Sequence, residues 1–214
     1  MSTGTRLLFN LISTSALLAL ASGCAMMNKH EPKPIDLATL ESARETGGGV
    51  AGPWTTLEDG VTNLVPEGTE VADGQVRDGT GVSIGLLKGF GARDLTIEAN
   101  LNYSGGGAPG LLFRVQESDG EITDMYAATL FSNGVNVWRF SSGRWMLLMT
   151  EAGRIAPRVP HALRVDAKGD RIQVYVDGQA LSELRDDSLT AGGRVGIRAL
   201  EGPCKFSGLR VSKR

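Results

Sequence analysis

The stretch HALRVDAKGDRIQVYVDGQALSEL, residues 161–184, carries the pattern that decides the fold. Apolar residues occupy every second position in two short runs, and the side chains of a strand alternate between the two faces of a sheet. Lys168-Gly169-Asp170 separates the runs and Asp177-Gly178 follows the second, and both are turn sequences. The pattern therefore predicts two antiparallel strands. Their inward row consists of Leu163, Val165, Ile172, Val174 and Val176.

The same period of two recurs along the chain from about residue 52. DLTIEANLNY, residues 94–103, and GLLFRVQ, residues 110–116, alternate in this way, and the chain contains 29 Gly but only 6% aromatic residues. About a dozen short strands joined by Gly-rich turns indicate an all-β sandwich or barrel of antiparallel strands. One helix is expected, over residues 35–44, with Asp36 as its N-cap and the glycines 47–49 at its end.

The order of several segments resembles a known group of domains. These segments are PGLLFRVQ (109–116), VNVWRFSSGRWMLLM (135–149), residues 161–181, GRVGIRAL (193–200) and KFSGLRV (205–211). Together they resemble the concanavalin A-like, laminin G-like jelly roll, over residues 52–214. The nearest look-alikes are the 3-keto-disaccharide hydrolase-like domains and the β-sandwich modules of levanase-type glycosidases. The resemblance implies a sandwich of antiparallel strands, a fold that hosts lectins, hydrolases and adhesion modules alike.

The N-terminal residues predict export. Arg6 precedes an apolar run, residues 7–20, that is shorter than the roughly 20 residues needed to span a bilayer. A secretory signal over residues 1–23 fits this pattern better than the alternative, a membrane-anchoring helix. Ala21-Ser22-Gly23-Cys24 resembles the lipobox of bacterial lipoproteins, although Ala21 stands where those proteins usually have Leu.

The lipobox resemblance implies that Cys24 is the acylated first residue of the mature protein. Ala25 follows it instead of the Asp that signals inner-membrane retention, so the expected location is the outer membrane, facing the periplasm. Residues 24–51 would then form a lipidated tether. Cys204 would be left without a partner, as a buried thiol alternating with Phe206; the alternative is a disulfide between Cys24 and Cys204.

Charge and motifs exclude some classes of function. Without Arg6, the mature chain has 21 Lys and Arg against 24 Asp and Glu, a net charge of −3, which gives no support to a nucleic-acid partner. Gly105-Gly106-Gly107 precedes no helix, so no phosphate-binding loop and no cofactor are indicated. His30 and His161 lie far apart in the sequence and do not indicate a metal site.

ESDGE, residues 117–121, has the acidic spacing of a strand motif in family 16 glycoside hydrolases, which share the jelly-roll fold. Those enzymes place apolar residues between the acids, whereas this chain has Ser118 and Gly120. Asp119-Gly120 favours a turn, and a turn scatters carboxylates that a retaining glycosidase needs about 5 Å apart. The prediction is an exposed connection without catalysis, and calcium binding by the three acids is a weaker alternative.

The resemblance to the keto-disaccharide hydrolases has a similar gap. Arg114 and Tyr126 match positions of that motif, but Ala-Ala-Thr-Leu at 127–130 replaces its acidic and amide residues. A hydrolase of such sugars is therefore the second interpretation, and an envelope lipoprotein that binds a protein partner is the third.

The preferred interpretation is a non-catalytic carbohydrate-binding domain anchored by lipid. Sugars stack on exposed aromatic rings and receive hydrogen bonds from planar polar groups, and the aromatic candidates include Trp145. Arg114, in the middle of its predicted strand, is expected to project from the outer face of the sheet. The predicted ligand-binding residues are Arg114, Gln116, Tyr126, Trp138 and Tyr175.

Overall fold

The computed structural model describes residues 33–34, 40–45, 54–56, 62–64, 70–72, 75–77, 82–104, 106–200, 202 and 204–214. In the six short segments before residue 82, only the side chains of Leu40 and Glu41 are described. The predicted signal peptide, Cys24 and much of the predicted tether lie outside these residues. Within the described part, the chain is all-β.

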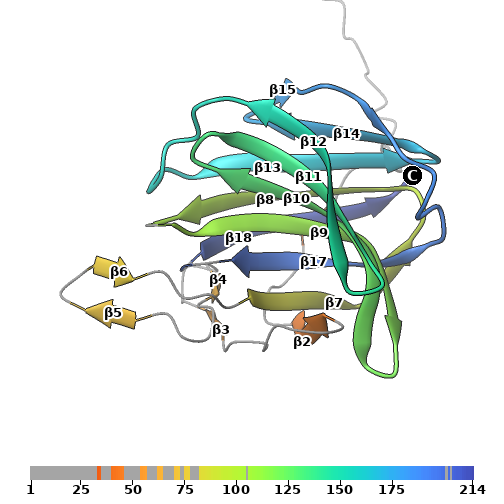
Figure 1. The fold of residues 1–214 in the computed structure, drawn as a ribbon, viewed down its shortest axis with the longest axis horizontal. Coiled ribbons are helices and arrows are strands. Elements are labelled where there is room, and N and C mark those ends of the chain that lie inside the picture. The colour runs from red at the N-terminus through yellow and green to blue at the C-terminus, as the bar shows by residue number, and fades with distance from the viewer. Residues whose placement is uncertain are drawn as a thin grey trace, which may run out of the picture.

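Two large sheets stack face to face (Figure 1). Sheet A has the order β15 (Gln179–Ala180), β14 (Arg171–Val176), β13 (His161–Lys168), β8 (Leu95–Tyr103), β18 (Cys204–Lys213), β4 (Thr62–Leu64) and β3 (Trp54–Thr56), with β1 (Lys33–Pro34) on β18 and β16 (Leu184–Arg185) on β14. Sheet B contains β12 (Arg144–Ala152), β11 (Gly134–Ser141), β10 (Glu121–Phe131), β9 (Ala108–Ser118), β17 (Gly193–Leu200), β7 (Val82–Ala92) and β2 (Leu40–Glu45). The strands β5 (Glu70–Ala72) and β6 (Gln75–Arg77) form a separate hairpin.

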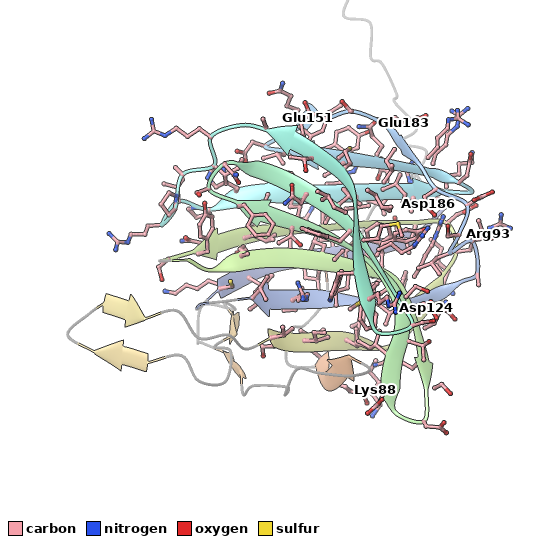
Figure 2. All side chains as sticks on the ribbon, in the orientation of Figure 1. Lys88, Arg93, Asp124, Glu151, Glu183 and Asp186 are labelled. Atoms are coloured by element: carbon pink, nitrogen blue, oxygen red, sulfur yellow. The ribbon has the colours of Figure 1, made fainter. Side chains whose placement is uncertain are left out.

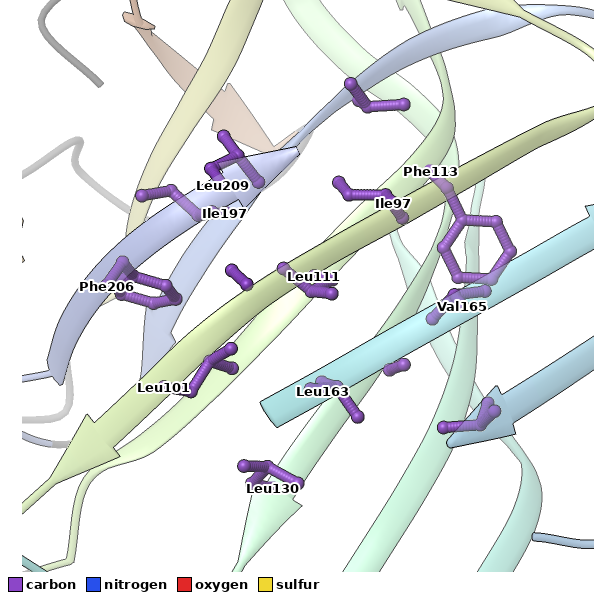
Figure 3. Close-up of a cluster of buried hydrophobic side chains, with 14 of the residues drawn as sticks. Ile97, Leu101, Leu111, Phe113, Leu130, Leu163, Val165, Ile197, Phe206 and Leu209 are labelled. Carbon is purple, nitrogen blue, oxygen red and sulfur yellow. The ribbon is translucent and has the colours of Figure 1, made fainter. Parts of the chain in front are cut away.

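The main apolar core lies between the two sheets (Figure 3). The predicted inward rows are confirmed, because Leu95, Ile97 and Leu101 of β8 and Val165 of β13 are fully buried. Cys204 and Phe206 of β18 also point into this core, as predicted. Among the described residues Cys204 has no disulfide partner, and burial raises the pKa of its thiol.

A second apolar cluster lies on the opposite face of sheet B. It includes Leu112 and Ala127. The residues on either side of each in the sequence belong to the main core: Leu111 and Phe113, and Tyr126 and Ala128. Five strands of this sheet form a closed circuit, in which β2 pairs with β7, β7 with β17, β17 with β9, β9 with β10, and β10 again with β2. Sheet B therefore supports apolar packing on both of its faces.

The prediction of a helix over residues 35–44 is wrong for residues 40–44, the part that the structure describes. Leu40–Glu45 is strand β2, which pairs antiparallel with β7 and, at its end, parallel with β10. Leu40 is 7% exposed and lies opposite Leu87, so pairing with an existing sheet buries its side chain and satisfies its backbone. A helix of about ten residues has little stability of its own, so these tertiary contacts outweigh its local preference.

The N-terminal region thus contributes strands to both sheets. β1 pairs with β18 in sheet A and β2 joins sheet B. In the part of the chain that the structure describes, no helix is long and apolar enough to cross a membrane.

Candidate functional site

The acidic stretch at residues 117–121 forms a hairpin connection, as predicted. β9 ends at Ser118 and β10 begins at Glu121, and Asp119 and Gly120 between them have φ angles of 53° and 81°. Positive φ at both positions is typical of a two-residue hairpin turn. Glu117 forms an ion pair with Arg194 at 2.9 Å. The carboxylates therefore do not form the single-strand row that a glycosidase motif requires.

The same stretch shows no calcium site. Among the described residues, no three His, Cys, Asp or Glu side chains gather in a way that could hold a metal ion.

Arg114 does not project from the outer face, and that expectation is wrong. β9 carries one extra residue here, because Leu112 and Val115 lie opposite Gly196 and Arg194 of β17. Arg114 adopts a φ of 53° in this bulge, and its side chain is completely buried. The bulge turns the side chain into the end of the sandwich, and this change of direction is a common effect of such irregularities.

All three nitrogens of the buried Arg114 guanidinium make hydrogen bonds inside the protein. It donates hydrogen bonds to the carbonyl oxygens of Arg93 at 2.9 Å, Leu189 at 3.0 Å and Gly169 at 2.7 Å. Burial lowers its pKa, and the nearby Tyr126 and Asp94 oppose this effect. Arg114 thus holds together three loops at one end of the sandwich, those that contain Arg93, Gly169 and Leu189.

Tyr126 belongs to the same interior network. Its hydroxyl donates to Oδ1 of Asp186 at 2.7 Å and accepts from the Leu189 amide at 3.1 Å. Arg139 donates to the other oxygen of Asp186 at 2.8 Å. Figure 2 labels Asp186 and Arg93 at the same end of the sandwich. We name Arg114, Tyr126, Arg139 and Asp186 the buried network.

The pKa values in the buried network follow from its packing. Burial raises the pKa of Tyr126, and its hydrogen bond to Asp186 adds to the effect. Burial also tends to raise the pKa of Asp186, but hydrogen bonds from Tyr126 and Ser188 and the charge of Arg139 outweigh it, so the pKa is lowered. Asp186 is therefore a carboxylate held by its neighbours. The network fixes the segment 186–189 against sheet B.

Gln116 and Trp138 lie in two further places. Gln116, near the C-terminal end of β9, donates from Nε2 to the carbonyl of Gly192 at 2.7 Å. Trp138 packs on the second apolar cluster, with its ring centroid 6.5 Å from that of Trp145 in an edge-to-face contact. Arg198 in turn covers Trp145 at 4.5 Å. The predicted site residues therefore do not form one site.

Tyr175 lines a hollow of about 460 Å³ on the outer face of sheet A, which we name the sheet A groove. One wall is a row of side chains on four adjacent strands. Register pairs Arg210 of β18 with Glu98 of β8, Glu98 with Arg164 of β13, and Arg164 with Tyr175 of β14. Directly opposed residues in neighbouring strands have side chains on the same face, so the row is continuous.

The space beside this wall exists because the next row of side chains is small. Asn100 of β8 lies opposite Ala162 of β13, and Gly178 and Gly208 complete the lining at its two sides. Gly208 has a φ of 61°, in a segment where β18 departs from regular pairing with β8. A larger side chain at Ala162, Gly178 or Gly208 would enter the groove.

The polar groups of the groove differ in how far they are already used. Arg164 makes two hydrogen bonds to Asp166, at 3.0 and 2.8 Å, and stacks over the Tyr175 ring at 5.1 Å. The Asp166 hydrogen bond raises the pKa of Arg164. Arg210 reaches Glu98 only at 3.8 Å, and its side chain is 51% exposed. Arg210 and Asn100 thus retain donors that a ligand could use.

Tyr175 was predicted from the sequence as a ligand-binding residue, whereas its neighbours Glu98, Asn100, Arg164 and Arg210 were not. Their outward position was readable from the alternation with buried residues, as in β8 and β13. Their proximity was not readable, because it depends on β8 lying between β13 and the C-terminal β18. That strand order is a property of the folded chain.

Comparisons with known proteins identify relatives of this sandwich. No family model matches the chain. Over 124 residues it is 31% identical to a levanase of Bacillus sp. (strain L7), an alignment that covers 56% of this chain but 13% of the levanase's length. The chain therefore spans a small part of that relative, and the likeness does not extend to the whole enzyme.

Solved structures share the fold at low sequence identity. The carbohydrate-binding module CBM66 from Bacillus subtilis matches with a TM-score of 0.65 and 19% identity, over 82% of this chain and 96% of that one. The β-glucanase of Bacillus licheniformis matches with a TM-score of 0.59 and 13% identity, over 82% and 93% of the two chains. These likenesses confirm the fold predicted from the sequence: the described domain is a concanavalin A-like jelly roll.

Proposed function

We propose that this protein is a lipid-anchored carbohydrate-binding domain of the bacterial cell envelope, and that it binds its ligand in the sheet A groove without hydrolysing it. The observation that carries the proposal is the groove itself. It combines a hollow of about 460 Å³ with the ring of Tyr175 and the polar side chains of Glu98, Asn100, Arg164 and Arg210. Ligand sites typically have volumes of roughly 300–1,000 Å³ and a few convergent polar groups.

The chemistry of the lining suits a sugar. Carboxylate, amide and guanidinium groups are planar and form paired hydrogen bonds with vicinal hydroxyls, while an aromatic edge or face contacts the apolar side of the ring. The levanase likeness and the carbohydrate-binding module with the same fold support this class of ligand.

The lining also favours binding over hydrolysis. Most glycosidases use two carboxyl groups, about 5–5.5 Å apart in retaining enzymes and about 6.5–9.5 Å apart in inverting ones. Among the described residues that line the groove, Glu98 alone carries a carboxylate. Hydrolysis remains the second candidate because a β-glucanase shares the fold. It would require a second carboxyl group at the bound sugar.

Anchoring through Cys24 would keep the groove close to a membrane. Cys24 precedes β1 by nine residues, a length that spans at most about 30 Å. β1 pairs with β18 at Arg210, which lines the groove. An outer-membrane lipoprotein facing the periplasm would thus present the groove to envelope glycans.

Binding can be tested by affinity electrophoresis in gels containing levan, mixed-linkage β-glucan or polygalacturonate. We expect retardation by at least one polysaccharide, lost in Tyr175→Ala and retained in Trp138→Ala. The matched control is informative because Trp138 lies on the other sheet. If Trp138→Ala loses binding and Tyr175→Ala keeps it, the site is on sheet B. If reducing ends accumulate in the gels, the protein is a hydrolase.

Anchoring is tested separately. Mass spectrometry of the mature N-terminus is expected to find acylated Cys24, and Cys24→Ser is expected to release the protein from the membrane fraction, because stable anchoring depends on the acyl chains. An unmodified Cys24 would contradict the lipoprotein assignment without affecting the groove.

A further inference from the structure

Among the described residues, the strand positions on the outer face of sheet A carry more cations than carboxylates, although the chain as a whole is acidic. The full sequence has a net charge of −2, yet the groove is lined by two arginines and one carboxylate. Beyond the groove, the outward positions of β8, β13, β14 and β18 and the adjacent Arg214 add further cations. Among the described residues, the cations at these positions are Arg164, Lys168, Arg171, Lys205, Arg210 and Arg214, and the carboxylates are Glu98 and Asp166. The adjoining turns add the carboxylates of Asp94, Asp170 and Asp177, of which Asp170 pairs with Arg185.

Of the two carboxylates, Asp166 is closely paired with cations and Glu98 only loosely. Asp166 accepts hydrogen bonds from Arg164, Thr96 and Arg214, the last at 2.9 Å. Glu98 stands between Arg164 and Arg210 in the cross-strand row. At the adjoining turn, Asp177 bonds His161 and the Ala162 amide, both at 2.8 Å. The described cations around the groove therefore outnumber its carboxylates, an arrangement that favours an anionic ligand.

Arg210 is the cation best placed to meet a ligand. Arg164 and Arg214 are held by Asp166, whereas Arg210 contacts Glu98 only at 3.8 Å, which is longer than a hydrogen bond. Its guanidinium can present a pair of N–H groups, the geometry that matches a carboxylate.

From this arrangement we infer that the sheet A groove selects sugars that carry a carboxylate, so that the ligand is an acidic, uronate-containing glycan. The uronate carboxylate pairs with Arg210 at the end of the row, while the pyranose ring occupies the hollow above Ala162 and beside Tyr175. The inference rests on the proposed carbohydrate-binding function and names the class of its ligand.

An anionic membrane surface would also attract a cationic face, but this face does not fit one. Its charges surround a hollow instead of a flat surface. Among the described residues, the exposed large apolar side chains are Met146, Leu147 and Val159, which lie outside the strands of this face. Peripheral membrane sites usually combine basic residues with inserted apolar ones.

The test is calorimetric titration with trimers of galacturonate, glucuronate and mannuronate and with their neutral methyl esters. At least one acid is expected to bind ten-fold or more tightly than its own ester, and the difference is expected to shrink as salt is raised. Arg210→Gln should reduce the affinity for the acid to that for the ester. Glu98→Gln should increase the affinity for the acid several-fold, because the substitution removes the carboxylate that competes with the ligand for Arg210.

Lys205→Gln is the matched control, since Lys205 is on the same face but does not line the groove. It is expected to change the affinity less than two-fold. Equal affinity for acid and ester would overturn the inference while leaving the carbohydrate-binding function intact. Failure of all these trimers, and of the neutral polysaccharides, would overturn both. Binding to phosphatidylglycerol vesicles without uronate binding would show that the face meets a membrane instead, which also overturns the inference.

Discussion

The buried network and the sheet A groove use the same kinds of side chain for different ends. Each combines arginine, tyrosine and a carboxylate. In the buried network, Arg114 is fully enclosed and bonds three carbonyls, and the Tyr126 hydroxyl both donates and accepts. In the groove, Arg210 is half exposed and only loosely paired. Residue type alone therefore does not distinguish a structural network from a binding surface; the hydrogen-bonding capacity that folding leaves free does.

The difference has a simple origin in strand regularity. The extra residue in β9 turns Arg114 toward the interior, under the segments around residues 93, 169 and 189. Gly193 permits this packing, because a β-carbon there would lie 2.5 Å from the carbonyl carbon of Arg114. Sheet A keeps its regular register in β8, β13 and β14. Strand β18 has a bulge of its own between Ser207 and Arg210, but its pairing with β8 resumes at Arg210, whose side chain stays outward.

The largest expected effect separates the two faces of β14. Val174→Asp places an unpaired charge in the core and should destabilise the fold by at least about 4 kcal/mol, enough to unfold a domain of ordinary stability. Tyr175→Asp, one residue along, should cost about 1 kcal/mol. Thermal unfolding followed by circular dichroism compares them, and equal melting temperatures would contradict the assignment of Tyr175 to the groove.

Arg114→Met breaks the buried network at its centre. It leaves three carbonyl groups without their donor and should lower the free energy of unfolding by about 3 kcal/mol. Arg210→Met, the matched change in the groove, should cost less than about 0.5 kcal/mol. Urea unfolding measures both variants. A similar loss in the two would remove the distinction between structural and ligand-binding arginines.

Asp186 should make stability depend on pH. Because its pKa is lowered in the folded state, its contribution is complete above the ordinary Asp pKa of about 3.9 and is lost as the pH falls through the lowered value. Asp186→Asn should cost about 2 kcal/mol at pH 7 and remove this part of the acid dependence. Urea unfolding at pH 7 and pH 3 tests this; a variant whose stability falls as steeply as that of the wild type would contradict it.

The smallest effect is expected in the acidic hairpin. Replacing Glu117 and Glu121 with Gln removes one ion pair, to Arg194, and should cost about 1 kcal/mol or less. Polysaccharide retardation should be unchanged, and wild type should release no reducing sugar from β-glucan. Loss of a hydrolytic activity in this double variant would instead identify the hairpin as catalytic.

The fold could be predicted because its determinants are local. Alternation in β8, β13 and β14 identified the inward rows, and Asp119-Gly120 and Asp177-Gly178 identified turns. Features that depend on distant contacts were missed. The local sequence of β2 favours a helix, and its strand conformation depends on pairing with the distant β7. The bulge that buries Arg114 likewise has no recognisable pattern in GLLFRVQ.

The candidate site was less predictable for the same reason. Tyr175 could be selected as an aromatic residue on an outward row. The groove, however, brings together Glu98, Arg164 and Arg210 from strands that are adjacent in the sheet but far apart in the sequence. Predicting it would have required knowledge of the strand order.

The assignment of the sheet A groove as the binding site is tested most directly by mapping a bound glycan onto the two sheets. The isotopically labelled domain would be titrated with oligosaccharides of the polysaccharide that retards it in the gel. Changes in its amide chemical shifts would then locate the binding site. We expect the largest changes at Glu98, Asn100, Arg164, Tyr175 and Arg210, with no comparable change at Trp138 or Trp145. Changes concentrated at those tryptophans, or at Arg114 and Tyr126 in the buried network, would contradict the assignment of the sheet A groove as the binding site.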